Sequence, residues 1–108
     1  METKRTVNQL AALAQETRLA VWRQLIVAGP QGMTVGAIGE ALDVPAATLS
    51  FHLKTLANAG LIVTRQEGRF IHCTADFDAM HGLINDLSEN CCGGADCASP
   101  AQPKRKRA

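Results

Sequence analysis

Apolar residues recur three or four positions apart through the first sixty residues, a spacing that places them on one face of a helix. The pattern predicts four helices, near residues 7–14, 17–28, 35–42 and 45–59. The apolar positions that define these helices are Val7, Leu10, Leu13, Leu19, Trp22, Leu25, Ile26, Val35, Ile38, Leu42, Leu49, Leu53 and Leu56. The amino-terminal half of the chain is therefore expected to be helical.

Residues with capping preferences indicate where two of these helices begin and end. Thr17 is expected to cap the second helix, because its hydroxyl can accept a hydrogen bond from a free N–H of the first turn, and Gly29 is expected to end it. Asp43 or Val44 is expected to cap the fourth helix. Pro45 then falls in the first turn, where its missing N–H has no cost.

The hydrophobic period changes in the second half of the chain. Residues 61–64 and 70–74 are rich in β-branched and aromatic side chains and flank a turn at residues 66–69, which predicts a β-hairpin. A last helix is expected to start near Asp76, with apolar positions at Phe77, Met80, Leu83, Ile84 and Leu87. Two helices joined by a tight turn and followed by a hairpin predict a mainly α winged helix-turn-helix fold, in the order α-α-α-α-β-β-α.

The length of 108 residues suits one compact domain with a tail. We place the domain at residues 1–90 and a cysteine-containing, basic, flexible tail at residues 91–108, where no large apolar side chain follows Cys97. No apolar run approaches the ~20 residues of a membrane span, and no secretory signal opens the chain. A cytoplasmic protein with no membrane partner is expected, and there four Cys more often mean free thiols or metal ligands than disulfides.

Charge is distributed unevenly along the chain, although the net charge is only +1. Residues 76–97 carry five acidic side chains and no basic one, whereas residues 104–107 are all basic. We expect this basic run to add nonspecific affinity for DNA.

The predicted helix at residues 45–59 offers a surface suited to DNA on the side opposite its apolar residues. No acidic residue lies between Asp43 and Glu67, and the phosphates that line a DNA groove favour a surface free of carboxylates. The candidate DNA-binding residues are Ala47, Thr48, Ser50, Phe51 and Lys54 on this helix and Arg65 and Arg69 on the hairpin. The alternative is an ordinary polar helix surface, since one lysine makes a thin basic patch. The order of helices and hairpin favours DNA binding.

The same segment resembles the ArsR-type repressors, the small winged-helix metalloregulators of bacteria and archaea. The resemblance spans about residues 7–89 and is most specific in Ser-x-His-Leu-x-x-Leu at residues 50–56 and Ala-Gly-Leu at residues 59–61. It implies a homodimer joined through the first and last helices, an operator that is an inverted repeat, and release of the DNA when an inducer binds. The last helix also carries more apolar side chains than one seam of a small domain needs, which favours a dimer.

The chain departs from the best-known arsenic-responsive members of that family. Those members carry Cys-Val-Cys-Asp-Leu at the start of the third helix, where this chain reads Thr-Val-Gly-Ala-Ile at residues 34–38 and has no thiol. The last helix also lacks the Asp/His and His/Glu spacing of the zinc-sensing members, because His81 is its only histidine. An inducer site is therefore expected elsewhere in the chain.

Three of the four cysteines gather after the last predicted helix, at Cys91, Cys92 and Cys97. Gly93 and Gly94 permit a tight reversal that can bring the three sulfurs together. Three thiolates without a nearby histidine suit trivalent arsenic or antimony better than zinc, which prefers four ligands. The resemblance points the same way, since some arsenite-responsive members carry vicinal cysteines in a C-terminal tail.

These patterns predict a metalloid-responsive repressor that leaves its operator DNA when As(III) or Sb(III) binds the three-cysteine site, with no organic cofactor. The alternatives are a repressor that senses cadmium, lead, mercury or the thiol redox state. A small thiol oxidoreductase is disfavoured, because no βαβ pattern is present and no base is paired with the thiols, so an enzyme is not expected. Cys73 is expected to be a buried apolar residue, and His52 to pack or to contact phosphate rather than bind a metal.

Overall fold

The computed structural model describes residues 3–95, so the predictions for Cys97 and for residues 104–107 lie outside the described residues. The helices are α1 (Thr3–Leu13), α2 (Glu16–Ala28), α3 (Val35–Leu42), α4 (Ala46–Asn58) and α5 (Phe77–Ser88); the strands are β1 (Met33–Thr34), β2 (Ile62–Glu67) and β3 (Phe70–Ala75); the short 3-10 turns are η1 (Gly29–Gln31) and η2 (Cys91–Gly94). None of the helices over this range is long and apolar enough to cross a membrane. The division of the chain near residue 90 stays a prediction.

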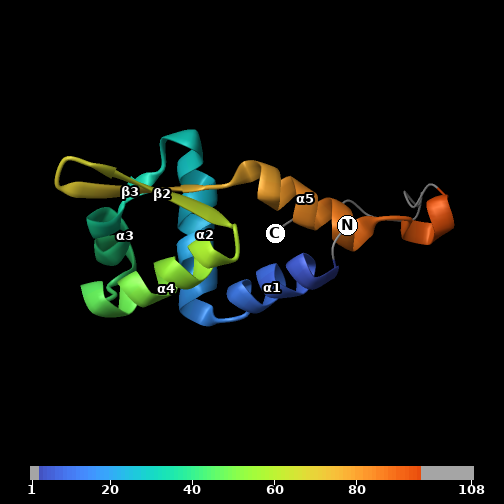
Figure 1. Ribbon diagram of the computed structural model, residues 1–108, viewed down its shortest axis with the longest axis horizontal. Coiled ribbons are helices and arrows are strands. Elements are labelled where there is room, and N and C mark those ends of the chain that lie inside the picture. The colour runs from blue at the N-terminus through green and yellow to red at the C-terminus, as the bar shows by residue number, and fades with distance from the viewer. Residues whose placement is uncertain (1–2, 96–108) are drawn as a thin grey trace.

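The predicted winged helix-turn-helix order is confirmed, with α2 in the centre and α3, α4 and the hairpin packed around it (Figure 1). The turn between β2 and β3 and the η2 turn lie at opposite ends of the long axis (Figure 1). Cys91 and Cys92 therefore lie far from the hairpin turn within one chain.

Two of the predicted helix caps are wrong. The side-chain oxygen of Gln15 accepts a hydrogen bond of 2.9 Å from the Arg18 backbone N–H, so Gln15 is the N-cap of α2 and Thr17 lies within its first turn. Asp43 instead ends α3 in the left-handed region (φ 55°), where a short polar side chain is tolerated. Pro45 is itself the N-cap of α4, because its extended conformation (ψ 149°) precedes the first helical residue.

The sheet has three strands rather than the predicted two. β1 pairs antiparallel with β3 through Met33 opposite Cys73 and gives the order β1-β3-β2. Gly32 makes this pairing feasible, because a Cβ at that position would collide with the Cys73 carbonyl. The hairpin strands are longer than predicted, and only Gly68 and Arg69 separate β2 from β3. A strand of two residues is too short to produce a periodic pattern, which explains why the sequence did not reveal β1.

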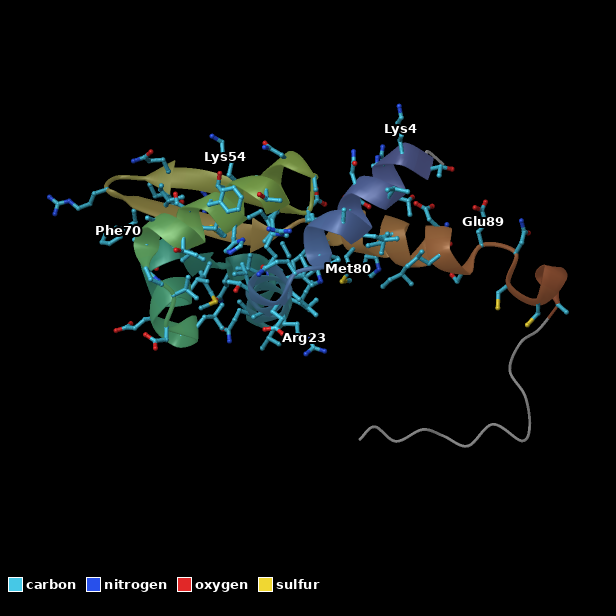
Figure 2. The ribbon with its side chains drawn as sticks, turned by 90° about the horizontal axis from the view of Figure 1, so that it is seen from below. Lys4, Arg23, Lys54, Phe70, Met80 and Glu89 are labelled. Atoms are coloured by element: carbon cyan, nitrogen blue, oxygen red, sulfur yellow. The ribbon has the colours of Figure 1, made fainter. Side chains whose placement is uncertain are left out.

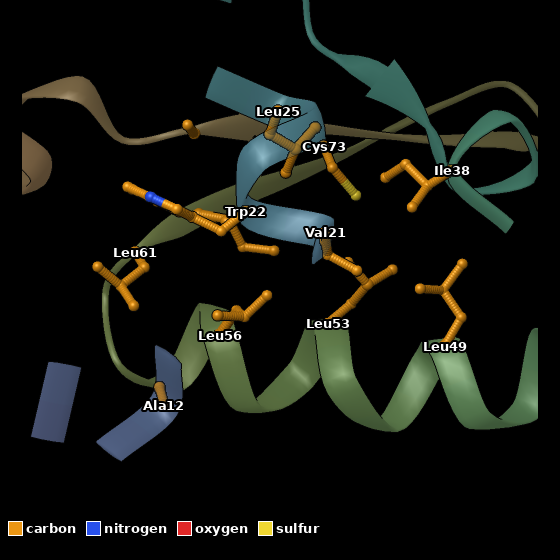
Figure 3. Packing of buried hydrophobic residues seen from close by; sticks show 12 residues of the cluster. Ala12, Val21, Trp22, Leu25, Ile38, Leu49, Leu53, Leu56, Leu61 and Cys73 are labelled. Atoms are coloured by element: carbon orange, nitrogen blue, oxygen red, sulfur yellow. The ribbon is translucent and has the colours of Figure 1, made fainter. Parts of the chain in front are cut away.

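The hydrophobic core lies between α2, α4 and the sheet (Figure 3). The predicted apolar stripe of α4 is confirmed, since Leu49, Leu53 and Leu56 are all buried. Val21 and Leu25 of α2 are fully buried in the same core cluster. Because α4 is anchored along this one side, its opposite side is held outward in a fixed orientation.

On α1 and α5, unlike α4, several residues of the apolar stripe are exposed to solvent. Leu83 is buried, but Ile84 and Leu87 on α5 are 55% and 59% exposed. On α1, Val7 and Leu10 are 55% and 40% exposed. Each stripe is therefore split: Leu13, Phe77 and Met80 pack against the core, whereas Val7, Leu10, Ile84 and Leu87 face outward in a single chain.

Candidate nucleic-acid interface and cysteine site

The outward side of α4 carries every residue of that helix predicted to bind DNA. The residues Ala47, Thr48, Ser50, Phe51 and Lys54 are all exposed. Phe51 is 62% exposed, and the helix contains no acidic residue. Lys54 projects to the side of the molecule opposite to Arg23 of α2 (Figure 2). This side of α4 can approach a DNA groove without carboxylate repulsion.

The two wing arginines differ in their surroundings. Arg69 lies exposed in the two-residue turn at the end of the hairpin. Arg65 is paired on the same strand with Glu67, with both Nε and Nη2 at 2.8 Å from Oε2. Residues alternate along β2, and Thr64 lines a cavity of about 350 Å³ with Ser50 and Lys54 of α4, so Arg65 lies on the other face of the hairpin. Arg69 is therefore the freer of the two for phosphate contact, and their contacts with DNA stay predictions.

His52 packs inside the domain rather than facing DNA. His52 is only 8% exposed, and its Nδ1 lies 3.2 Å from Nη1 of Arg18. Of the two roles expected from the sequence, packing is the one observed. The contact with Arg18 was not foreseen, because the two residues lie 34 positions apart and neither belongs to a local motif that links them.

Cys91 and Cys92 lie exposed in the η2 turn, just after α5. The Cys91 thiol donates to the Cys92 sulfur at 3.7 Å, so the two sulfurs already share one side of the turn. Asn90 and Cys92 both have positive φ values, 59° and 56°, which fold the backbone back sharply here. Between Thr3 and Ala95 no three potential ligands from His, Cys, Asp and Glu gather at one point. Cys97, the predicted third sulfur, lies outside the described residues.

Cys73 is fully buried in β3, between Leu25 and Ile38 in the core (Figure 3). Burial raises the pKa of its thiol from 9.0 to about 11, because an apolar environment disfavours the thiolate. The prediction that Cys73 is a small apolar core residue is confirmed.

Known proteins similar to this chain include several regulators. A family described as a helix-turn-helix domain matches residues 13–65. The arsenical resistance operon repressor of Bacillus subtilis (strain 168) is 31% identical, over 83% of this chain and 87% of the repressor. The HTH-type transcriptional regulator YceK of the same organism is 43% identical over 54% of this chain, and the match spans only 57% of its own length.

One solved structure with the same fold is the homodimeric winged helix-turn-helix DNA-binding domain (fragment 1–100) of Mb0332 from Mycobacterium bovis. It has a TM-score of 0.64 and 21% identity, and the match covers 89% of each chain. At that identity the likeness establishes the fold alone. Both Bacillus relatives are regulators of transcription, which agrees with the expectation that this chain is not an enzyme. From its sequence similarity over most of its length and from its fold, the chain belongs to the ArsR family of winged helix-turn-helix transcriptional regulators.

Proposed function

We propose that the chain is a dimeric transcriptional repressor that binds an inverted-repeat operator and leaves it when As(III) or Sb(III) binds Cys91, Cys92 and Cys97. The observation that carries the DNA-binding part is the exposed, acid-free side of α4, anchored from behind by a buried leucine stripe. Ser50 and Thr48 offer hydroxyls to base edges or phosphates, and Phe51 offers an apolar contact to a thymine methyl. Lys54 and Arg69 supply phosphate contacts.

The exposed apolar residues of α1 and α5 support the dimer. Val7, Leu10, Ile84 and Leu87 would remain in water in a single chain, and large exposed apolar patches mark interaction surfaces. The related domain Mb0332 is homodimeric. A twofold axis through α1 and α5 would present two copies of α4 to two half-sites about one helical turn of DNA apart.

The vicinal thiols support the choice of inducer. Soft thiolates select soft thiophilic ions, and a trivalent metalloid is satisfied by three sulfurs. The 3.7 Å distance between the two exposed sulfurs fits two donors to one centre, and Cys97 would supply the third. The same proximity favours one second candidate, a repressor whose DNA release follows oxidation of these thiols.

Release follows from the position of the thiols at the end of α5. Ligation by Cys91, Cys92 and Cys97 would reorder the chain directly beyond the proposed dimer seam and so change the separation of the two α4 helices. A coupling free energy of ~1–3 kcal/mol between the two sites would weaken operator affinity about 5–150-fold. That range is sufficient to free a promoter.

The test is fluorescence anisotropy of a labelled duplex that the reduced wild-type protein has selected from a random pool. The proposal predicts binding by a dimer and release by arsenite or antimonite, with cadmium, lead and zinc as comparison ions. Release by diamide or peroxide but not by arsenite would assign the site to redox sensing. A reduced protein that selects no duplex at low salt would exclude the repressor function altogether.

A further inference from the structure

Arg18 of α2 makes contacts with both α1 and α4. Its backbone N–H is held by the Gln15 cap at the start of α2. Its Nε donates a hydrogen bond of 2.6 Å to the carbonyl oxygen of Ala12 in the last turn of α1, and its Nη1 lies 3.2 Å from Nδ1 of His52 on α4. One guanidinium therefore bridges the end of α1 and the middle of α4.

The direction of this contact follows from its chemistry. A guanidinium has only donors, so a hydrogen bond here requires Nδ1 of His52 to accept, which is the tautomer with the ring proton on Nε2. The same ring meets Phe51 edge to face, with 5.4 Å between the ring centroids and 62° between the ring planes. A continuous series of contacts thus runs from the Ala12 carbonyl through Arg18 and His52 to the exposed Phe51.

An open surface groove of about 340 Å³ borders Arg18 between α1 and α4. Its lining consists of small or polar residues, namely Asn8, Ala11, Ala12, Arg18, Thr55, Asn58 and Ala59. Large interlocking apolar side chains do not hold α1 against α4 at this point. Ala12 of α1 shares the core cluster with Leu56 of α4, and the contacts of Arg18 add directional constraints to that packing, since hydrogen bonds from a charged donor are strong and geometrically specific.

We propose that Arg18 and His52 are positioning residues that set the angle between α1, the proposed dimer helix, and α4, the proposed DNA-reading helix. The inference rests on the proposed function, because the angle matters only in a dimer that reads two half-sites. In that dimer the pair determines the distance between the two α4 helices and hence the half-site spacing that binds best. Neither residue needs to touch DNA.

The experiment compares the full chain with three variants on three kinds of duplex selected by the wild-type protein. The duplexes are the full inverted repeat, a single half-site, and repeats whose spacer is one or two base pairs shorter or longer. Arg18→Met keeps the apolar stem and loses the donors, and His52→Leu loses the acceptor. His52→Asn is the matched control, because its side-chain oxygen can accept in place of Nδ1.

Arg18→Met and His52→Leu are expected to bind the full repeat on the order of tenfold more weakly, the scale of a lost hydrogen bond to a charged group. Their half-site affinity should change less than about twofold, and their preference for one spacer length should flatten. His52→Asn should keep the wild-type affinity for the full repeat and the wild-type spacer preference. The double variant Arg18→Met/His52→Leu should lose no more affinity for the full repeat than either single variant.

Three results would overturn the positioning role. They are an equal loss on half-site and full repeat, an unchanged spacer preference, or no loss at all. Urea unfolding of each variant identifies any that does not fold. The comparison of His52→Leu with His52→Asn then tests the positioning role. If the wild-type protein selects no duplex, the proposed function fails and the positioning role fails with it. A wild-type protein that binds while the variants keep its spacer preference sinks the positioning role alone.

Discussion

Cys73 and the pair Cys91 and Cys92 carry the same functional group in opposite surroundings. Cys73 lies on β3, the central strand of the sheet, where the core encloses it, and burial raises the pKa of its thiol to about 11. Cys91 and Cys92 lie exposed in a sharply turned segment beyond α5, with their sulfurs 3.7 Å apart. Thiolates react and ligate, whereas buried thiols act as small apolar side chains. The fold therefore places one cysteine in the core and leaves the other two accessible to reagents and ligands.

The largest difference should appear in alkylation by iodoacetamide. At pH 8 a thiol with a pKa of about 11 is ionised in roughly one molecule in a thousand, and the core also excludes the reagent. Cys91 and Cys92 should be modified more than about a hundredfold faster than Cys73. Mass spectrometry of peptides after timed quenching gives the rates. The unfolded protein in urea serves as the control, in which the difference should largely disappear.

The next effect concerns release from DNA. Each of three single variants should keep its operator affinity in the absence of arsenite: Cys91→Ser, Cys92→Ser and Cys97→Ser. In each of them, arsenite should no longer cause the decrease of about 5–150-fold in operator affinity that is expected for the wild type. Cys73→Ala is the matched control and should still respond. Anisotropy with and without arsenite measures both quantities. If all three single serine variants still respond, the inducer site lies elsewhere.

A smaller effect is expected from one charge on the DNA-facing side. Lys54→Gln should weaken operator binding on the order of tenfold near 0.15 M salt, because the dimer loses two phosphate contacts and its salt slope falls by about two. Arg23→Gln removes the same charge from the opposite side of the molecule (Figure 2) and should leave the slope unchanged. Sedimentation must show that both variants remain dimers. Equal slopes for the two variants would contradict the assignment of the α4 surface.

A last effect is an alkaline loss of stability due to Cys73. Its pKa is raised in the folded state, so the protonated thiol stabilises the fold fully below pH 9 and this stabilisation disappears as the pH rises through about 11. The free energy of unfolding should fall by about 2 kcal/mol more between pH 9 and 11 in the wild type than in Cys73→Ala, because the two pKa values lie about two units apart. Urea denaturation at each pH measures the difference. Parallel curves would show that the folded thiol titrates normally.

The elements that the sequence predicted well are those that bury a regular stripe. α4 is the example, because Leu49, Leu53 and Leu56 recur at helical spacing and all reach the core. The exposed side followed from the same spacing, so the position of Phe51 and Lys54 was foreseen. The location of Cys73 was foreseen from strand alternation. Local periodicity was sufficient in each of these cases.

Features that depend on distant parts of the chain were missed. β1 has two residues and exists only through its pairing with β3. One local feature was also missed: the α2 cap is Gln15 rather than Thr17, because the Gln15 side-chain oxygen accepts a hydrogen bond from the Arg18 N–H three residues later. The contact of Arg18 with His52 joins two helices through tertiary packing alone. No pattern of spacing in the sequence encodes such contacts.

The central claim is that capture of a metalloid by the exposed thiols drives release of operator DNA. One titration tests it most directly: arsenite is added to the reduced protein–duplex complex, and the same samples give the DNA-bound fraction by anisotropy and the bound arsenic by equilibrium dialysis with elemental analysis. The account predicts that DNA leaves in step with arsenic binding, up to one arsenic atom per subunit. DNA that remains bound at one arsenic per subunit, or DNA that leaves while no arsenic is bound, would contradict it.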